Sequence, residues 1–123
     1  MLIKKYADHF LVKTPTCGEL REILKDGEYA PLGIAIAIEI RPTLPHYHLT
    51  FDEIYFMLDG EIDLLIYDPS TEEKRQYTLG ENELLVITKG LHHQITRASP
   101  QNRLCVISAP PFQADDEHPS QIL

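Results

Sequence analysis

Apolar and polar residues alternate over short runs along most of this chain, a period of two that is typical of β-strands. In the clearest run, residues 34–40, four isoleucines alternate with two alanines and a glutamate. Almost no run keeps the longer period of a helix, and nine prolines and six glycines separate the runs. The pattern therefore predicts strands at residues 34–40, 53–58, 62–66, 75–79, 83–87, 92–96 and 103–108.

Two turn signals divide the middle of the chain. The pair Asp59-Gly60 lies between two alternating runs, and both residues tolerate the positive φ of a tight turn. It predicts a two-residue hairpin that joins residues 53–58 to residues 62–66. The sequence Asp-Pro-Ser-Thr at residues 68–71 predicts the next turn. Many short strands with turns between them indicate an all-β sandwich or barrel.

The two ends of the chain are less regular. Residues 19–25 have helical spacing but cover only about two helical turns, so either a short helix or a strand fits them. Residues 2–12 fit an edge strand. Residues 113–123 contain three consecutive acidic residues and are predicted to form a flexible acidic tail. We therefore expect one domain at residues 1–112.

Composition excludes several classes of protein. Lysine and arginine number 11 against 19 aspartates and glutamates, which gives a formal net charge of −8. An acidic surface repels phosphate groups, so we expect no binding to nucleic acid or to a membrane. No apolar run approaches the ~18 residues that span a bilayer. No secretion signal is visible, and Cys17 and Cys105 are too few for a disulfide framework, so we expect a cytoplasmic protein with reduced thiols.

Three histidines and one glutamate form a candidate metal site. His46 and His48 are two residues apart, so strand periodicity places both imidazoles on one face. Glu53 follows after four residues, and His93 ends a later segment, residues 88–93. This donor set suits a divalent transition metal such as Mn, Fe, Ni, Cu or Zn. The alternative is a surface loop with solvated side chains, but the spacing of His46, His48, Glu53 and Gly60 alone arises by chance with odds on the order of one in a thousand.

This spacing resembles the motifs of the cupin superfamily. His-x-His, four residues, Glu, six residues and Gly, at residues 46–60, match the first cupin motif, and the stretch that ends at His93 resembles the second. The resemblance covers residues 34–108. It implies the cupin double-stranded β-helix, a jelly-roll barrel. It also implies that the metal ligands are His46, His48, Glu53 and His93.

Three positions depart from the family's pattern. The glycine usually found six residues before the first histidine is Ile40 here, and the leading glycine and the proline of the second motif are Asn82 and Thr88. Asparagine adopts the left-handed backbone conformation more readily than most residues. We therefore expect Asn82 to make the same turn, and the departures affect loops while all four ligand positions are filled.

Four more residues are candidates for the substrate pocket. Tyr55, Met57 and Ile95 continue the period of the two strands that carry ligands, although they could equally fill the core. Arg41 could pair with a substrate carboxylate or phosphate, and its alternative is a solvated charge at a strand end. His92 alternates to the opposite face from its ligand neighbour, unless the register slips by one residue.

An ion held by four protein groups keeps two positions for substrate or dioxygen if it is six-coordinate. Such a site favours a small polar or anionic molecule. Three functions remain open: a metal-dependent enzyme of dioxygenase or oxidoreductase type, which is our first expectation, a sugar or sugar-phosphate isomerase or epimerase, and a non-catalytic small-ligand-binding module. We also expect a homodimer, because cupins of this kind commonly pair and an amino-terminal edge strand offers a surface.

Overall fold

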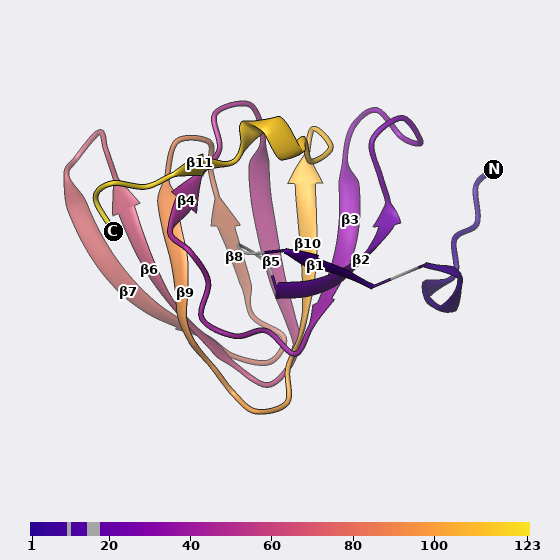
Figure 1. Ribbon diagram of the computed structural model, residues 1–123, viewed down its shortest axis with the longest axis horizontal. Coiled ribbons are helices and arrows are strands. Elements are labelled where there is room, and N and C mark those ends of the chain that lie inside the picture. The colour runs from indigo at the N-terminus through magenta and orange to yellow at the C-terminus, as the bar shows by residue number, and fades with distance from the viewer. Residues whose placement is uncertain (10, 15–17) are drawn as a thin grey trace.

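The computed structural model describes residues 1–9, 11–14 and 18–123, which form two antiparallel sheets (Figure 1). Their strands are β1 (Val12–Thr14), β2 (Gly18–Leu24), β3 (Gly33–Ile38), β4 (His46–Tyr47), β5 (Asp52–Asp59), β6 (Ile62–Asp68), β7 (Glu73–Leu79), β8 (Leu84–Ile87), β9 (His92–Ala98), β10 (Arg103–Ala109) and β11 (His118–Pro119). Two short 3-10 helices are η1 (Tyr6–Asp8) and η2 (Ala114–Asp116). One sheet has the order β1-β2-β3-β10-β5-β8 and the other β11-β4-β9-β6-β7.

The predicted all-β jelly-roll fold is confirmed, and each of the strands predicted from the alternating pattern is present. The sheets do not close into the predicted barrel, however. Among the described residues, β1 pairs with β2 and β8 pairs with β5, and neither edge strand bonds to the other sheet. The result is a sandwich of two facing sheets (Figure 1).

Alternate side chains of the strands fill the space between the sheets. Tyr55 and Met57 of β5 are at most 1% exposed, and Ile62 and Leu64 of β6, in the other sheet, are fully buried. Burial of each such side chain contributes about 1.5–3 kcal/mol. The period of two therefore reports which side of each strand faces the core.

The prediction of a hairpin at Asp59-Gly60 is wrong. This pair links β5 to β6, which belong to different sheets, because β5 is already paired on both sides, with β10 and β8. The turn residue itself behaves as the sequence indicates. Gly60 has φ +78°, and a Cβ atom there would overlap the carbonyl oxygen of Gln101. The tight turn that connects the two sheets therefore depends on a residue without a side chain.

The second predicted turn, at residues 68–71, is confirmed. Strands β6 and β7 form a hairpin in which Asp68 faces Glu73. The Asp68 carboxylate accepts hydrogen bonds from the backbone N–H and the hydroxyl of Ser70. Local side-chain bonding thus stabilises this turn.

Residues 19–24 belong to strand β2, so the helical spacing of this segment does not produce a helix. Strand β2 pairs with β1 on one side and with β3 on the other, so sheet contacts outweigh a weak local preference. The predicted edge strand at residues 2–12 is wrong for most of its length, because η1 forms there and β1 begins at Val12. Cys105 is a free thiol, and Cys17 lies outside the described residues.

The segment predicted to be a flexible tail packs across one end of the sandwich (yellow, top of Figure 1). In β11, His118 faces Tyr47 of β4, and the Ser120 N–H donates to the Pro45 carbonyl at 3.0 Å. The acidic run suggested solvation, but the Asp116 side chain is buried and accepts hydrogen bonds, as described below. No helix among the described residues is long and apolar enough to cross a membrane.

Candidate metal centre

The four predicted ligands come together from three strands and one loop. His46 lies on β4 and faces His93 of β9 in the sheet register, His48 follows β4, and Glu53 lies near the start of β5. All four side chains are buried, and their ligand atoms lie within 4.8 Å of one another. The structure thus brings together residues that are up to 47 positions apart, 46 to 93, at one end of the sandwich.

Backbone carbonyls orient the three imidazoles. Each Nδ1 atom donates a hydrogen bond to a carbonyl, so each ring directs its Nε2 atom toward the shared centre. The pairs are His46 with Leu44 at 3.0 Å, His48 with Asp116 at 2.8 Å and His93 with Leu91 at 3.1 Å.

The Nε2 atoms and one carboxylate oxygen form the centre itself. The Nε2 atoms of His48 and His93 each lie 3.0 Å from Oε1 of Glu53. The Nε2 atom of His46 is buried and has no hydrogen-bond partner. A buried acceptor without a partner is costly, by about 1–3 kcal/mol. Three nitrogen donors and one oxygen donor fit a divalent transition metal, which would also give the Nε2 atom of His46 a partner.

Burial and mutual contacts shift the ionisation of these groups in opposite directions. Burial and the neighbouring His93 lower the pKa of His46 to about 3, so this ring is neutral at physiological pH. Burial also works against the charged form of His48, but the hydrogen bond and charge of Glu53 prevail and raise the pKa of His48. Burial would raise the pKa of Glu53, yet the hydrogen bonds from His48 and His93 hold it far below its usual value. In the metal-free protein, His48 and Glu53 therefore form a proton-bearing pair in the position that suits an ion.

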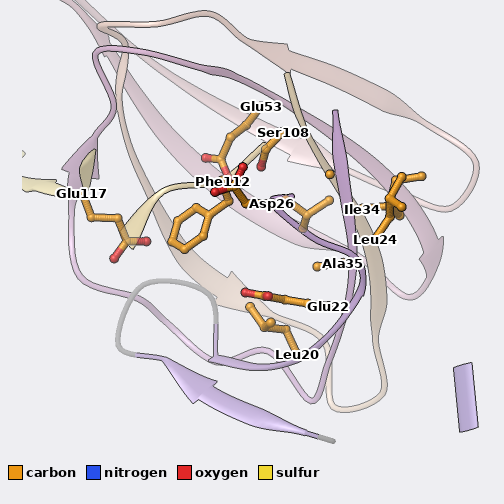
Figure 2. A pocket seen from close by; sticks show the side chains of 12 residues that line it. Leu20, Glu22, Leu24, Asp26, Ile34, Ala35, Glu53, Ser108, Phe112 and Glu117 are labelled. Carbon is orange, nitrogen blue, oxygen red and sulfur yellow. The ribbon is translucent and has the colours of Figure 1, made fainter. Parts of the chain in front are cut away.

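A cavity of about 60 Å³ reaches this centre at Glu53 (Figure 2). Ser108 of β10 faces Glu53 across the sheet, is 5% exposed and also lines the cavity. Phe112 stands beside them and makes an edge contact with the ring of His48, with 6.4 Å between centroids. The remaining lining residues are Leu20, Glu22, Leu24, Asp26, Gly33, Ile34, Ala35, Val106 and Glu117.

Comparison of sequences finds no relative: no protein family and no curated protein matches this chain. Comparison of structures finds proteins with a similar fold. A protein from Planctomyces limnophilus superposes with a TM-score of 0.79 at 20% identity, covering 96% of both chains. Oxalate decarboxylase from Bacillus subtilis superposes with a TM-score of 0.78 at 16% identity, over 97% of this chain. The chain has the cupin fold.

The coverage of these cupin structures differs. This chain spans 33% of the oxalate decarboxylase chain, so it corresponds to one part of that enzyme. It spans 92% of Streptomyces PAC13, a variant of which was solved with uridine, with a TM-score of 0.77 at 10% identity. At such low identity the likeness concerns the fold alone.

None of the four pocket candidates lines this cavity. Tyr55, Met57 and Ile95 do face inward, but they belong to the apolar core. The ring centroid of Tyr55 lies 6.4 Å from that of His93. Arg41 is exposed and borders a separate surface depression. Residues that continue the period of the ligand-bearing strands therefore pack in the core and do not line the cavity.

His92 points away from the centre, as alternation predicts. Its ring stacks on Tyr47, with 4.2 Å between centroids, and its Nδ1 atom lies 2.6 Å from the Ser120 hydroxyl. The register therefore does not slip at these two residues of β9, and His93 faces His46. The left-handed turn expected of Asn82 is confirmed by its φ of +63°.

Sequence reasoning missed Asp116. Its carbonyl orients His48, and its carboxylate accepts hydrogen bonds from the backbone N–H groups of Leu49 and Thr50 and from the Thr50 hydroxyl. His118 contacts the same carboxylate at 2.9 Å. No local spacing marks Asp116, because its contact with His48 joins residues 68 positions apart.

Proposed function

We propose that this protein is a metal-dependent cupin enzyme of the oxidoreductase or dioxygenase type that acts on a small polar molecule. The ligands of its divalent ion would be His46, His48, Glu53 and His93. The observation that carries the proposal is the buried Nε2 atom of His46, which has no partner and lies beside the other three ligand atoms.

The hydrogen-bond network of the site supports a metal more strongly than a purely structural cluster. In a purely structural cluster, every buried polar atom is expected to have a hydrogen-bond partner. The Nε2 atom of His46 has none. The Nδ1 bonds to backbone carbonyls also fix each ring, as partners of metal-binding histidines do. A shared ion would satisfy all three Nε2 atoms at once.

When bound, a divalent transition ion would supply Lewis-acid chemistry and, if it is redox-active, electron transfer. The chain supplies the surroundings. Glu53 forms the floor of the cavity, the Ser108 hydroxyl beside it can hydrogen-bond a substrate oxygen, and Phe112 excludes water from the side of His48. Mn, Fe, Ni, Cu and Zn all suit this donor set, and the Mn(II) centres of Bacillus subtilis oxalate decarboxylase, a protein of the same fold, support Mn.

The cavity argues against the sugar-phosphate form of one alternative, a sugar or sugar-phosphate isomerase or epimerase. A phosphate needs arginine, lysine or clustered N–H donors, and no lysine or arginine is among the described residues that line the cavity. A non-catalytic ligand-binding module remains the second outcome of the test below. That the protein is a homodimer in the cytoplasm stays a prediction.

The test combines elemental analysis with oxygen uptake. The purified protein, reconstituted with each of the five metals in turn, should hold one ion per chain and should consume oxygen with at least one member of a panel of small diketones, thiols, phenols and amino alcohols. The His46→Ala variant should lose both properties, whereas His92→Ala should keep them. Failure of the wild-type protein to bind any of the metals would overturn the proposal. Binding of metal without oxygen uptake would retain the metal centre and refute the oxidoreductase activity.

A further inference from the structure

The outer side of the six-stranded sheet is apolar across the four adjacent strands β3, β10, β5 and β8 (Figure 1). Alternation along each strand separates this side from the core. In β5, for example, Tyr55 belongs to the buried core cluster, whereas Ile54 and Phe56 on either side of it do not. The register aligns such outward residues in two neighbouring rows, which together we call the apolar face. One row is Ile36, Cys105, Phe56 and Leu84, and the other is Ile107, Ile54 and Val86.

The apolar face is open to solvent in the part of the chain that the structure describes. Leu84 and Val86 are 57% and 47% exposed, and the other side chains of the two rows are partly exposed. The amino-terminal η1 meets the sheet at the β2 border of this face, where Arg21, the register partner of Ile36, lies 4.3 Å from the centroid of the Tyr6 ring. Soluble monomers rarely leave so many neighbouring apolar side chains in contact with water.

Charged residues border the apolar face at the two ends of its strands. At one end, Arg103 of β10 forms an ion pair with Asp59 of β5. At the other end, the Asp52 carboxylate accepts a hydrogen bond from the Lys89 backbone N–H. None of the residues in the two rows is charged, although 24% of the chain is. A partner for this face therefore needs an apolar surface and no complementary charge.

A second copy of this chain offers such a surface. In a two-fold dimer the same patch of both subunits meets itself, and a uniformly apolar patch is complementary to its own copy. Two sheets with β-branched outward side chains can pack face to face, as the sheets of a sandwich do. The five strands from β2 to β8, taken as a flat surface with ~4.8 Å between strands and ~3.3 Å per residue, cover about 500 Å². Specific interfaces bury about 600–1,000 Å² per partner, so this face with its rim is large enough.

We infer that the apolar face is the interface of a homodimer in which two copies of this chain pack sheet against sheet. The cavity beside the proposed metal centre lies on the opposite side of the same strands, because Val106 and Ser108 line it and Ile107 between them points outward. Each subunit would therefore keep its own cavity. The inference goes beyond the proposed function and does not depend on the metal.

Sedimentation velocity of the full chain at increasing protein concentration tests the dimer. We expect a species of twice the 14.1 kDa chain mass. Each copy carries a formal net charge of −8, so salt should screen the repulsion between subunits and strengthen the dimer. A wild-type protein that stays monomeric at every concentration would overturn the inference. A dimer that dissociates as salt rises would do so too, since charged contacts would then hold it together.

Two substitutions locate the interface. Leu84→Glu and Val86→Glu change exposed side chains, so the fold should be retained, which circular dichroism checks. Each places like charges on both subunits within an apolar interface and should raise the dimer dissociation constant at least about a hundredfold. Tyr77→Glu is the matched control, because Tyr77 is an exposed apolar residue of β7 in the other sheet. Dimers of both β8 variants as tight as the wild type would refute this interface.

The wild-type protein provides an independent measurement through Cys105, a partly exposed free thiol in the first row of the apolar face. Alkylation of this thiol, followed by mass spectrometry, should slow as concentration raises the dimer fraction. An alkylation rate that does not change while the mass doubles would place the interface elsewhere. Elemental analysis tests the proposed metal centre separately, so the two proposals can fail independently.

Discussion

The backbone carbonyl of Asp116 accepts a hydrogen bond from Nδ1 of His48 at 2.8 Å, although the two residues lie 68 positions apart. This contact decides which way one of the proposed ligands points, because a ring that donates from Nδ1 directs Nε2 toward the opposite side. The carboxylate of the same residue accepts hydrogen bonds from the loop that follows His48, at Leu49 and Thr50. The C-terminal segment is therefore part of the proposed metal centre.

Replacement of Asp116 should loosen the metal without removing a ligand. In Asp116→Ala, the N–H groups of Leu49 and Thr50 and the Thr50 hydroxyl lose their acceptor, and the carbonyl that orients His48 becomes less well fixed. We expect about a tenfold loss of metal affinity and a fall of about 1–3 kcal/mol in the free energy of unfolding. Metal titration and urea unfolding measure the two effects. Asp115→Ala, which changes an exposed neighbour, should have neither effect, and equal behaviour of the two variants would contradict the role of Asp116.

Replacement of a ligand should have a larger effect than replacement of its neighbour. His48→Ala removes one of four donors, so metal affinity should fall by more than the roughly 10–100-fold typical of changes outside the ligand set. His92→Ala is the matched control, since His92 lies next to a proposed ligand and contacts Tyr47 and Ser120 instead. Elemental analysis after dialysis distinguishes them. Full occupancy in His48→Ala would refute the ligand assignment.

Metal binding should weaken at a higher pH than it would at an ordinary histidine site. An ion and a proton compete for Nε2 of His48, and Glu53 raises the pKa of His48 above its usual value of 6.5. Affinity should therefore begin to fall as pH drops through that raised pKa, by about tenfold per pH unit once His48 is mainly protonated. His46, with a pKa of about 3, stays neutral throughout this range and adds nothing to the effect.

Calorimetric titration in two buffers with different ionisation heats should detect protons released on metal binding near neutral pH. Release should diminish as the pH rises above the raised pKa of His48. Equal metal affinity at pH 5.5 and pH 8 would contradict the His48–Glu53 pairing.

Two glycines with positive φ should respond differently to the same substitution. Gly60→Ala pays the cost of left-handed backbone and also forces a Cβ atom against the carbonyl of Gln101 and the hydroxyl of Ser99. Gly90→Ala has a similar φ but no atom within 4 Å of the added Cβ, so only the backbone cost of about 1–2 kcal/mol applies. Thermal unfolding should show the larger loss of Tm for Gly60→Ala. Equal losses would mean that the corner can relax around an added methyl group.

The alternating pattern predicted strands well and their partners poorly. Residues 53–58 and 62–66 are strands, but the Asp59-Gly60 pair between them turns a corner between sheets because β10 and β8 already flank β5. Likewise, residues 19–24 form part of a strand because β1 and β3 lie on either side. Periodicity shows which face of a segment is apolar, but it does not show which other strands that segment will pair with.

The order of residues along the chain determined the strand faces and the tight turns at Gly60 and Asn82, because each depends on chemistry that neighbouring residues express locally. The four candidate donors at residues 46, 48, 53 and 93 were predicted from a spacing that resembles the cupin motifs. Only the tertiary structure decided that Tyr55 packs in the core and that Arg41 borders a surface depression away from the metal centre. It also decided that Glu22 and Glu117 line the same cavity. Those outcomes depend on which strands pair and on where the last residues of the chain cross them. Such long-range pairing is set by the summed burial of many side chains, which no single stretch of sequence displays.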